Sequence, residues 1–226
     1  MSESCKTLFL LVESSIERIP KELWTHPAVK ADCKRRHRSP SKILLYTPIH
    51  YTAMIDNNIP PQKRGRPDIL HRTLLILLDS PINKSGLLDI YIHTINDLII
   101  WVNPIVRLPL DYYRFEGLII QLLEKGRVPP EGSDIFLKIL YGCSLKDLVK
   151  DRLVFLLTEK GERINRDILS KLIGNVIILG AFQEGDYRSD ILELADYKIS
   201  VSPYTHHAST VAGIITTLMS QYLSII

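Results

Sequence analysis

The sequence contains few cysteines, and their positions suggest neither a disulfide framework nor a paired metal knuckle. Its 226 residues include only Cys5, Cys33 and Cys143, an odd number of thiols that lie far apart in the chain. Such spacing favours a reducing, intracellular setting. The remaining composition, with 46% hydrophobic and 23% charged residues, is ordinary for a globular protein that is large enough to bury its own core.

The chain also lacks an apolar run long enough to enter or cross a membrane. The N-terminal run LFLLV is too short for the apolar region of a signal peptide, and Glu13 and Glu17 follow it closely. The C-terminal run TVAGIITTLMSQYLSII is short and carries several hydroxyl groups and a glutamine. We therefore expect a packed final helix at the C-terminus and no membrane partner.

Common nucleotide-binding and catalytic signatures are missing as well. The stretch LGAFQEG lacks the GxGxxG spacing of dinucleotide-binding loops, and no Gly-Lys-Ser/Thr follows it as in phosphate-binding loops. There is no nucleophile elbow and no obvious acid–base pair of carboxylates. His206 and His207 are adjacent, so they point in different directions in any regular element, and no other cluster supplies further metal ligands. The sequence therefore predicts no metal site.

Positive charge is concentrated in one part of the chain. Residues 30–72 contain ten Lys and Arg against three Asp, a balance of +7, whereas the whole chain carries only +3. The remaining residues therefore sum to −4. A basic zone on an otherwise mildly acidic protein suggests a polyanionic partner such as nucleic acid. The alternative is a charged face that is merely solvated.

The hydrophobic pattern predicts an α/β protein. Short apolar runs predict strands at residues 6–14, 42–47, 152–158, 175–181 and 198–202. Helical stretches are predicted within residues 21–40 and at 69–80, 112–126, 165–173, 189–195 and 208–223. Two β-rich runs, 87–94 and 98–104, predict a hairpin. We expect a mostly parallel sheet flanked by helices, interrupted by a hairpin-bearing insertion at about residues 80–115.

Three loops follow strands in the C-terminal half, where the carboxyl ends of parallel strands gather ligands. Their sequences are LTEKGER, LGAFQEGDY and SVSPYTHH, and two of them carry glycine where a ligand could approach the backbone closely. By spacing alone, Gly180 and Gly185 fit ordinary strand-end and turn positions equally well.

The stretch RGRPDILHR, residues 64–72, surrounds one proline with three arginines and an aspartate. Pro67 suits the first position of a helix, and Asp68 complements the positive end of the helix dipole. These charges fit either a solvated helix start or a grip on a phosphate or a base.

Several long motifs resemble one known family. The runs RPDILHRTLLILLDSPINKSGLLDIYIHT, VNPIVRLPLDYYRFEGLIIQLLEKG and VIILGAFQEGDY…ISVSPYTHHASTVAG resemble the ribosome-biogenesis family of small-subunit rRNA pseudouridine N1-methyltransferases. That family belongs to the SPOUT, or α/β-knot, class. The resemblance implies a single domain over residues 1–226, with a trefoil knot and the cofactor site in about residues 150–226. It also implies a homodimer whose RNA site lies near the subunit interface.

The resemblance further implies S-adenosyl-L-methionine as methyl donor and small-subunit rRNA as partner, with small-subunit ribosomal or assembly proteins as further partners. The compact chain suits an archaeal-like member and a cytoplasmic location, or a nucleolar one in a eukaryote. Two alternatives stay open: a non-catalytic rRNA-binding assembly factor, and a SPOUT methyltransferase that acts on another RNA base.

Individual residues carry the family's roles by position. The family's RNA-contacting arginines match Arg66, Arg107 and Arg114, whereas a further arginine position is occupied here by Leu110. Asp68 matches the aspartate that orients Arg66, and it is a second choice as acceptor of the substrate proton, beside water or an RNA phosphate. The implied cofactor-binding residues are Leu157, Gly180, Gly185, Val201, Ser202, Pro203, Tyr204, Thr205 and His206.

Overall fold

The computed structural model describes residues 6–226, so Cys5 lies outside the described part. One eight-stranded sheet runs through it in the order β4-β5-β3-β2-β1-β7-β6-β8. The strands are β1 (Thr7–Ser14), β2 (Leu88–Thr94), β3 (Ile99–Val102), β4 (Arg127–Val128), β5 (Leu137–Ile139), β6 (Val154–Arg163), β7 (Val176–Gly180) and β8 (Tyr197–Ser200). The five strands from β2 to β8 pair in parallel, and β3, β5 and β4 continue the sheet in antiparallel fashion.

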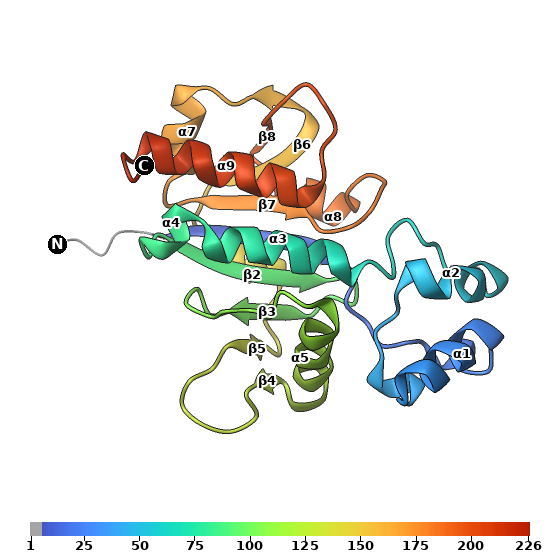
Figure 1. Cartoon of the computed structure of the whole chain (residues 1–226). Helices are drawn as coiled ribbons and strands as arrows, with labels where there is room; N and C mark the ends of the chain where they lie inside the picture. Colours follow the sequence, from blue (N-terminus) through green and yellow to red (C-terminus); the bar gives the residue numbers. More distant parts are fainter. Residues whose placement is uncertain (1–5) are drawn as a thin grey trace.

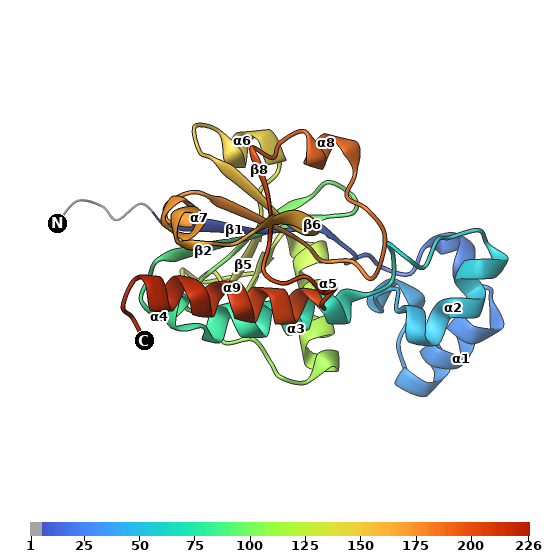
Figure 2. The same cartoon turned by 90° about the horizontal axis from the view of Figure 1, so that it is seen from above.

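Helices cover both faces of this sheet (Figure 2). One face carries α3 (Pro67–Asp79), α4 (Pro81–Lys84), α5 (Tyr112–Lys125), α7 (Arg166–Leu172) and α9 (Ala208–Tyr222), and the other carries α6 (Leu145–Val149) and α8 (Ser189–Leu192). Strand β1 shows why: Phe9 and Leu11 belong to the first core, whereas Leu8 and Leu10 belong to the second. A strand buried on both faces reads as a continuous apolar run. The predicted mostly parallel α/β sheet is confirmed.

The predicted hairpin is present and is continuous with the sheet. Strands β2 and β3 pair antiparallel, with Ile90 opposite Val102, while β2 also pairs in parallel with β1. The predicted final helix is confirmed too, because α9 packs its buried residues Ala212, Ile215 and Met219 into the first core. Among residues 6–226, no helix combines the length and the apolar character that a membrane crossing requires.

Residues between β1 and α3 form a small helical lobe beside the sheet (Figure 1). It contains α1 (Pro27–Arg36) and α2 (Thr47–Asp56), which enclose a separate apolar cluster that includes Leu23 and Met54. The lobe is tied to α5 through Glu116, which is fully buried. Glu116 pairs with Arg36 of α1 and accepts a 3.0 Å hydrogen bond from the Leu44 amide. A buried charge that is paired and hydrogen-bonded in this way is costly to disrupt, so it anchors the lobe.

The strand predicted at residues 42–47 is wrong. After a single 3-10 turn at Pro40–Lys42, the chain makes only an isolated bridge between Leu44 and Arg18, and α2 begins at Thr47. Leu44 enters the main core, whereas Ile43 and Leu45 enter the core of the lobe. An extended run between two cores is as apolar as a strand, although no neighbouring strand pairs along it.

Glycine in the loop LTEKGER serves strand packing. A Cβ on Gly161 would lie 2.5 Å from both the amide nitrogen and the carbonyl carbon of Ile199 in β8. The sequence-based interpretation of this glycine as room for a ligand is therefore wrong. The missing side chain lets the main chain of β8 approach closely, where β6 and β8 shift register.

We expect Gly161→Ala to lower the free energy of unfolding by about 1–3 kcal/mol, because backbone atoms of Ile199 must move to admit the methyl group. Urea denaturation measures this change. Gly117→Ala is the control, since a Cβ there meets no atom within 4 Å in α5. The control should stabilise the protein by roughly 0.5–1 kcal/mol. Equal effects of both variants would contradict the close approach of β8.

Candidate active site

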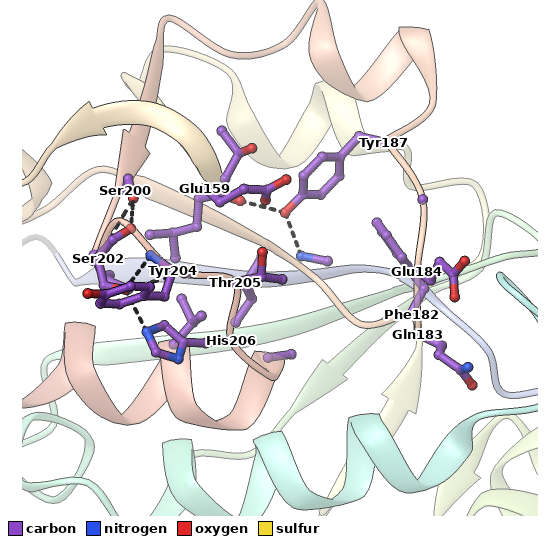
Figure 3. Close-up of a pocket in the computed structure, with 18 residues that line it drawn as sticks. Glu159, Phe182, Gln183, Glu184, Tyr187, Ser200, Ser202, Tyr204, Thr205 and His206 are labelled. Atoms are coloured by element: carbon purple, nitrogen blue, oxygen red, sulfur yellow. Dashed lines mark hydrogen bonds between the residues drawn. The ribbon is translucent and has the colours of Figure 1, made fainter.

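A cavity of about 290 Å³ lies beside the register shift in β6 and the ends of β7 and β8 (Figure 3). The three loops picked out in the sequence converge on it. The predicted cofactor residues that line it are Leu157, Gly180, Gly185, Val201, Ser202, Tyr204, Thr205 and His206. Pro203 belongs to the same loop but does not line the cavity. The structure thus brings these residues together, while their contacts with a cofactor stay a prediction.

Tyr187 holds two of these loops in place (Figure 3). Its hydroxyl accepts a 2.9 Å hydrogen bond from the Gly180 amide and donates a 2.7 Å hydrogen bond to the Leu157 carbonyl. Burial raises the pKa of the Tyr187 hydroxyl well above its ordinary value, so it keeps the proton that it donates. No sequence pattern predicts this bridge, because a tyrosine beside a glycine loop is common.

We expect Tyr187→Phe to weaken S-adenosylmethionine binding about tenfold and to lower the free energy of unfolding by ~1–3 kcal/mol, since the Gly180 amide and Leu157 carbonyl lose their partner. Calorimetry and urea denaturation measure the two effects. Tyr91→Phe is the matched control: Tyr91 is a half-buried sheet residue whose hydroxyl makes no hydrogen bond within residues 6–226. If Tyr187→Phe behaves like this control, the bridge does not shape the cavity.

The loop that follows β8 supports itself. The Ser200 hydroxyl donates to the Ser202 carbonyl at 2.6 Å, and the Ser202 hydroxyl accepts from the Tyr204 amide at 3.0 Å. The same Ser202 hydroxyl lies 2.6 Å from Nε2 of His206. These contacts order the loop before any ligand binds. His206 is thereby engaged with Ser202, and no group of three His, Cys, Asp or Glu side chains among residues 6–226 could hold a metal ion.

The charge of this cavity is acidic. Glu159 and Glu184 line it, and no lysine or arginine stands among its described lining residues. Carboxylates attract a positively charged ligand and repel phosphate groups. The cavity therefore suits a cationic sulfonium compound better than a nucleoside di- or triphosphate.

Lys63, which no sequence pattern singled out, supports the cavity through Phe182, one of its lining residues. Its ammonium lies 3.3 Å from the centre of the Phe182 ring and donates a 3.1 Å hydrogen bond to Glu13. It also donates to the Asp186 carbonyl at 2.5 Å. The buried Glu13 carboxylate accepts a further hydrogen bond from the Arg188 amide at 3.2 Å. Lys63 and Glu13 therefore connect the segment before α3 and the end of β1 to the loop that follows β7.

A second cavity of about 310 Å³ adjoins the first. Ile69 and Arg72 of α3 form one side of it, and Ser209 and Thr210 of α9 form another. The two cavities share a wall made by Phe182, Gln183, Thr205, His206 and Ala208. The loops after β7 and β8 therefore contact both cavities, and molecules bound in the two cavities would be neighbours.

Arg66 and Asp68 line neither cavity, but Arg66 contacts the shared wall through Gln183. Nε and Nη2 of Arg66 donate to the two carboxylate oxygens of Asp68 at 2.8 and 2.9 Å, and Nη1 donates to Oε1 of Gln183. Arg72 also donates to Asp68, at 2.7 Å. Burial alone would raise the pKa of Asp68, but the Arg66 and Arg72 guanidiniums outweigh it and lower this pKa. Asp68 is therefore suited to orient Arg66 and is a weak proton acceptor.

The other predicted RNA-binding residues lie apart from Arg66 within one chain. Arg107 and Leu110 are exposed on the loop between β3 and α5, where they line a wider groove of about 1110 Å³ along α3, α4 and α9. Arg114 is exposed in the first turn of α5. The structure therefore pairs Arg66 with Asp68 as predicted but does not bring Arg107 into the same cavity.

The basic zone of residues 30–72 is partly neutralised by the fold. Lys63 pairs with Glu13, Arg64 with Glu17, Arg36 with Glu116 and Lys42 with Glu124. Acidic partners from distant segments therefore lie beside four cations of the basic zone, while the predicted polyanionic partner stays a prediction. The exposed positive charge is concentrated on α1, which carries Lys30, Lys34 and Arg35.

The mostly parallel sheet and its cavity fit a methyltransferase of the SPOUT class, which the comparison with a solved structure shows. A crystal structure of Archaeoglobus fulgidus Nep1 bound to S-adenosylhomocysteine is similar to the chain, with a TM-score of 0.86 and 35% identity over 97% of this chain and 99% of that one. The family described as EMG1/NEP1 methyltransferase matches residues 9–220, and the chain belongs to this family.

Two curated relatives show the same relationship in sequence. Both are named ribosomal RNA small subunit methyltransferase Nep1. The protein of Saccharolobus solfataricus is 42% identical over 198 residues, which cover 86% of this chain and 88% of the relative. That of Archaeoglobus fulgidus is 43% identical over 192 residues, which cover 84% of each.

Proposed function

We propose that the protein transfers a methyl group from S-adenosylmethionine to N1 of a pseudouridine in small-subunit rRNA, as a step in assembly of the small ribosomal subunit. Membership of the EMG1/NEP1 methyltransferase family makes it a methyltransferase that uses this donor. The names of its relatives support small-subunit rRNA as the substrate. The observation that carries the proposal is the pair of adjoining cavities with a shared wall.

The first cavity fits the donor. Its two carboxylates and its lack of lysine and arginine, among the residues described, match the positive charge of a sulfonium. Gly180 lets the Phe182 ring, which lines the cavity, lie against the main chain, since a Cβ there would lie 2.6 Å from that ring. We assign the predicted residues from Leu157 to His206 to this ligand. Backbone groups of the loop after β8, ordered by Ser200 and Ser202, would face it.

The second cavity fits the target base. Because pseudouridine joins its sugar through carbon, its ring N1 keeps an N–H that uridine lacks. Bound S-adenosylmethionine supplies an electrophilic methyl group on a positively charged sulfur. The chain would hold N1 in line with the methyl carbon where the two cavities meet, so that the N1–C bond could form as the S–C bond breaks and S-adenosylhomocysteine leaves. Such positioning can contribute ~7–11 kcal/mol. A base flipped out of an RNA loop could enter past Arg66 and Arg72.

The proton on N1 must leave during the reaction. Asp68 accepts hydrogen bonds from both Arg66 and Arg72, which lower its pKa. We therefore assign Asp68 to the orientation of Arg66, and assign the proton to water or to a phosphate of the bound RNA. Arg66 in turn fixes the Gln183 side chain, which places an amide at the wall between the two cavities.

Mass spectrometry of nucleosides tests the function directly. Small-subunit rRNA from cells with and without the gene should differ by one N1-methylated pseudouridine, and purified protein should restore it with S-adenosylmethionine. Unmodified pseudouridine in both samples, with normal RNA binding, would instead favour a non-catalytic assembly factor. Methylation of another nucleoside would keep the enzyme and change its target. The same assignment supports a cytoplasmic location.

We propose in addition that the protein is a homodimer. Two aliphatic side chains, Ile105 and Leu110, are 86% and 85% exposed at the rim of the groove along α3 and α9. Such exposure is unfavourable in water and typical of an interface. A second copy seated there would also carry Arg107 toward a neighbouring site. The trefoil knot implied by the family belongs to the same proposal.

Sedimentation of the purified protein should therefore show a dimer at micromolar concentration, with or without cofactor. The double variant Ile105→Asp/Leu110→Asp should sediment as a monomer, because it buries two charges in the interface. Phe136→Asp, at a residue that is 41% exposed elsewhere, is the control and should leave the dimer intact. A monomeric wild type would refute the interface.

A further inference from the structure

An aromatic strip runs from the Arg66 site to the start of α5. The rings of Tyr46 and Tyr112 stack with their centres 5.0 Å apart, and Tyr113 meets Tyr112 edge-on at 5.6 Å. Tyr46 lies close enough to Asp68 and Arg66 for both to influence the pKa of its hydroxyl, which burial raises. The centres of Tyr46 and Tyr113 are at most about 11 Å apart, from the two ring distances. The strip therefore begins near the Arg66–Asp68 pair.

The far end of this strip is open to solvent. Tyr113 is 47% exposed, whereas Phe115, two residues later in the chain, is fully buried and stacks on His71. The core is therefore filled by Phe115 and Tyr112, and the fold gains little from a large ring at position 113. An exposed aromatic side chain beside a binding site points to a ligand with a flat face.

Arginines surround the exposed ring. The guanidinium of Arg36 lies 4.9 Å from the centre of the Tyr113 ring. Arg35 is close enough to Tyr113 for the hydroxyl to raise the pKa of its guanidinium, after the larger effect of Asp32. Arg114, next in the chain, is exposed. Rings interleaved with arginines are the pattern of single-stranded nucleic-acid sites, where bases stack and phosphates pair with cations.

We infer that Tyr113 stacks against an unpaired base of the substrate RNA that neighbours the target nucleotide, while Arg114 contacts an adjoining phosphate. This inference rests on the proposed function, because it needs RNA at the Arg66 site. It adds a subsite that reads no sequence, since every base offers a flat face. Its role is to hold the loop open beside the nucleotide that enters the second cavity.

The test measures binding of a small-subunit rRNA hairpin that carries the target pseudouridine. Tyr113→Ala should weaken binding about 5- to 20-fold, within the range for loss of one stacked base, and Tyr113→Phe should bind like the wild type. Tyr141→Ala is the matched control, since Tyr141 is 75% exposed on a turn after β5. S-adenosylmethionine affinity should be the same for all three variants.

A series of hairpins with one abasic sugar at each loop position identifies the stacked base. At one position next to the target, the abasic sugar should weaken wild-type binding and leave Tyr113→Ala binding unchanged. Additive losses at every position would overturn the inference, as would equal weakening by Tyr113→Phe or no weakening by Tyr113→Ala. Arg66→Ala separates the two proposals. If it weakens binding while Tyr113→Ala does not, only the stacking subsite fails; if neither does, the RNA site itself fails.

Discussion

Gly180→Val is expected to raise the dissociation constant for S-adenosylmethionine at least about 100-fold, which corresponds to roughly 2.7 kcal/mol. A Cβ at this position would lie 2.6 Å from Cε1 of Phe182 and 3.2 Å from Cε1 of Tyr187. Both rings line the cavity, so either the new side chain or a displaced ring fills space that the ligand needs. Displacement of Tyr187 would also release its hydrogen bonds to Gly180 and Leu157.

Isothermal calorimetry measures this loss, and circular dichroism verifies that the variant is folded. Gly117→Val is the matched control, because a Cβ there meets open space on α5, outside the lining of either cavity. The control should bind the cofactor like the wild type. A folded Gly180→Val protein with unchanged affinity would show that the ligand does not use the loop after β7.

Much of the fold could be predicted because burial leaves a local imprint. Strand β1 is buried on both faces and is apolar from Leu8 to Val12, and strands that alternate with helices after residue 152 indicate parallel pairing. The strand predictions failed where residues are buried without pairing in the sheet, and where paired strands are very short. Residues 43–45 are buried between two cores without a neighbouring strand, and β4 and β5 are too short to leave a pattern.

The candidate site could be predicted in its loops but not in its supports. Loops at the carboxyl ends of β6, β7 and β8 had to converge once the strands were parallel. The contacts that hold them join residues far apart: Lys63 reaches the Asp186 carbonyl, and Glu13 accepts from the Arg188 amide. No local pattern encodes such pairs. The Arg66–Asp68 pair was accessible because both residues lie in one helical turn.

The partial neutralisation of the basic zone has a consequence for RNA binding. Arginines that are paired with buried carboxylates, such as Arg64 with Glu17, are structural, so their charge does not reach a ligand. Arg66 differs, because its Nη1 also donates to Gln183 in the wall that the two cavities share. Arg107 and Arg114 are exposed and free to move toward phosphates. Removal of Arg107 or Arg114 should therefore affect mainly RNA binding, whereas removal of Arg66 should affect methyl transfer.

Arg107→Ala and Arg114→Ala should weaken hairpin binding and reduce the slope of log affinity against log salt by about one unit each, because each removes one phosphate contact. Neither should change methyl transfer once RNA is saturating. Lys138→Ala, an exposed cation on β5, is the control for net charge and should alter neither quantity. Unchanged binding in both arginine variants would remove them from the RNA site.

Arg66→Ala should lower single-turnover methyl transfer about 100-fold even at saturating RNA, because it removes both a charged donor near the target base and the hydrogen bond that fixes Gln183. Asp68→Ala should imitate it, since Arg66 then loses its two-point contact and swings free. Asp68→Asn keeps one acceptor and should retain more activity than Asp68→Ala. Because Arg66 and Arg72 lower the pKa of Asp68 in the wild type, this carboxylate is ionised at neutral pH and should add no step to the pH profile of wild-type methyl transfer near neutrality. Full activity of Asp68→Ala, or equal methylation of uridine and pseudouridine hairpins by the wild type, would refute this arrangement of the site.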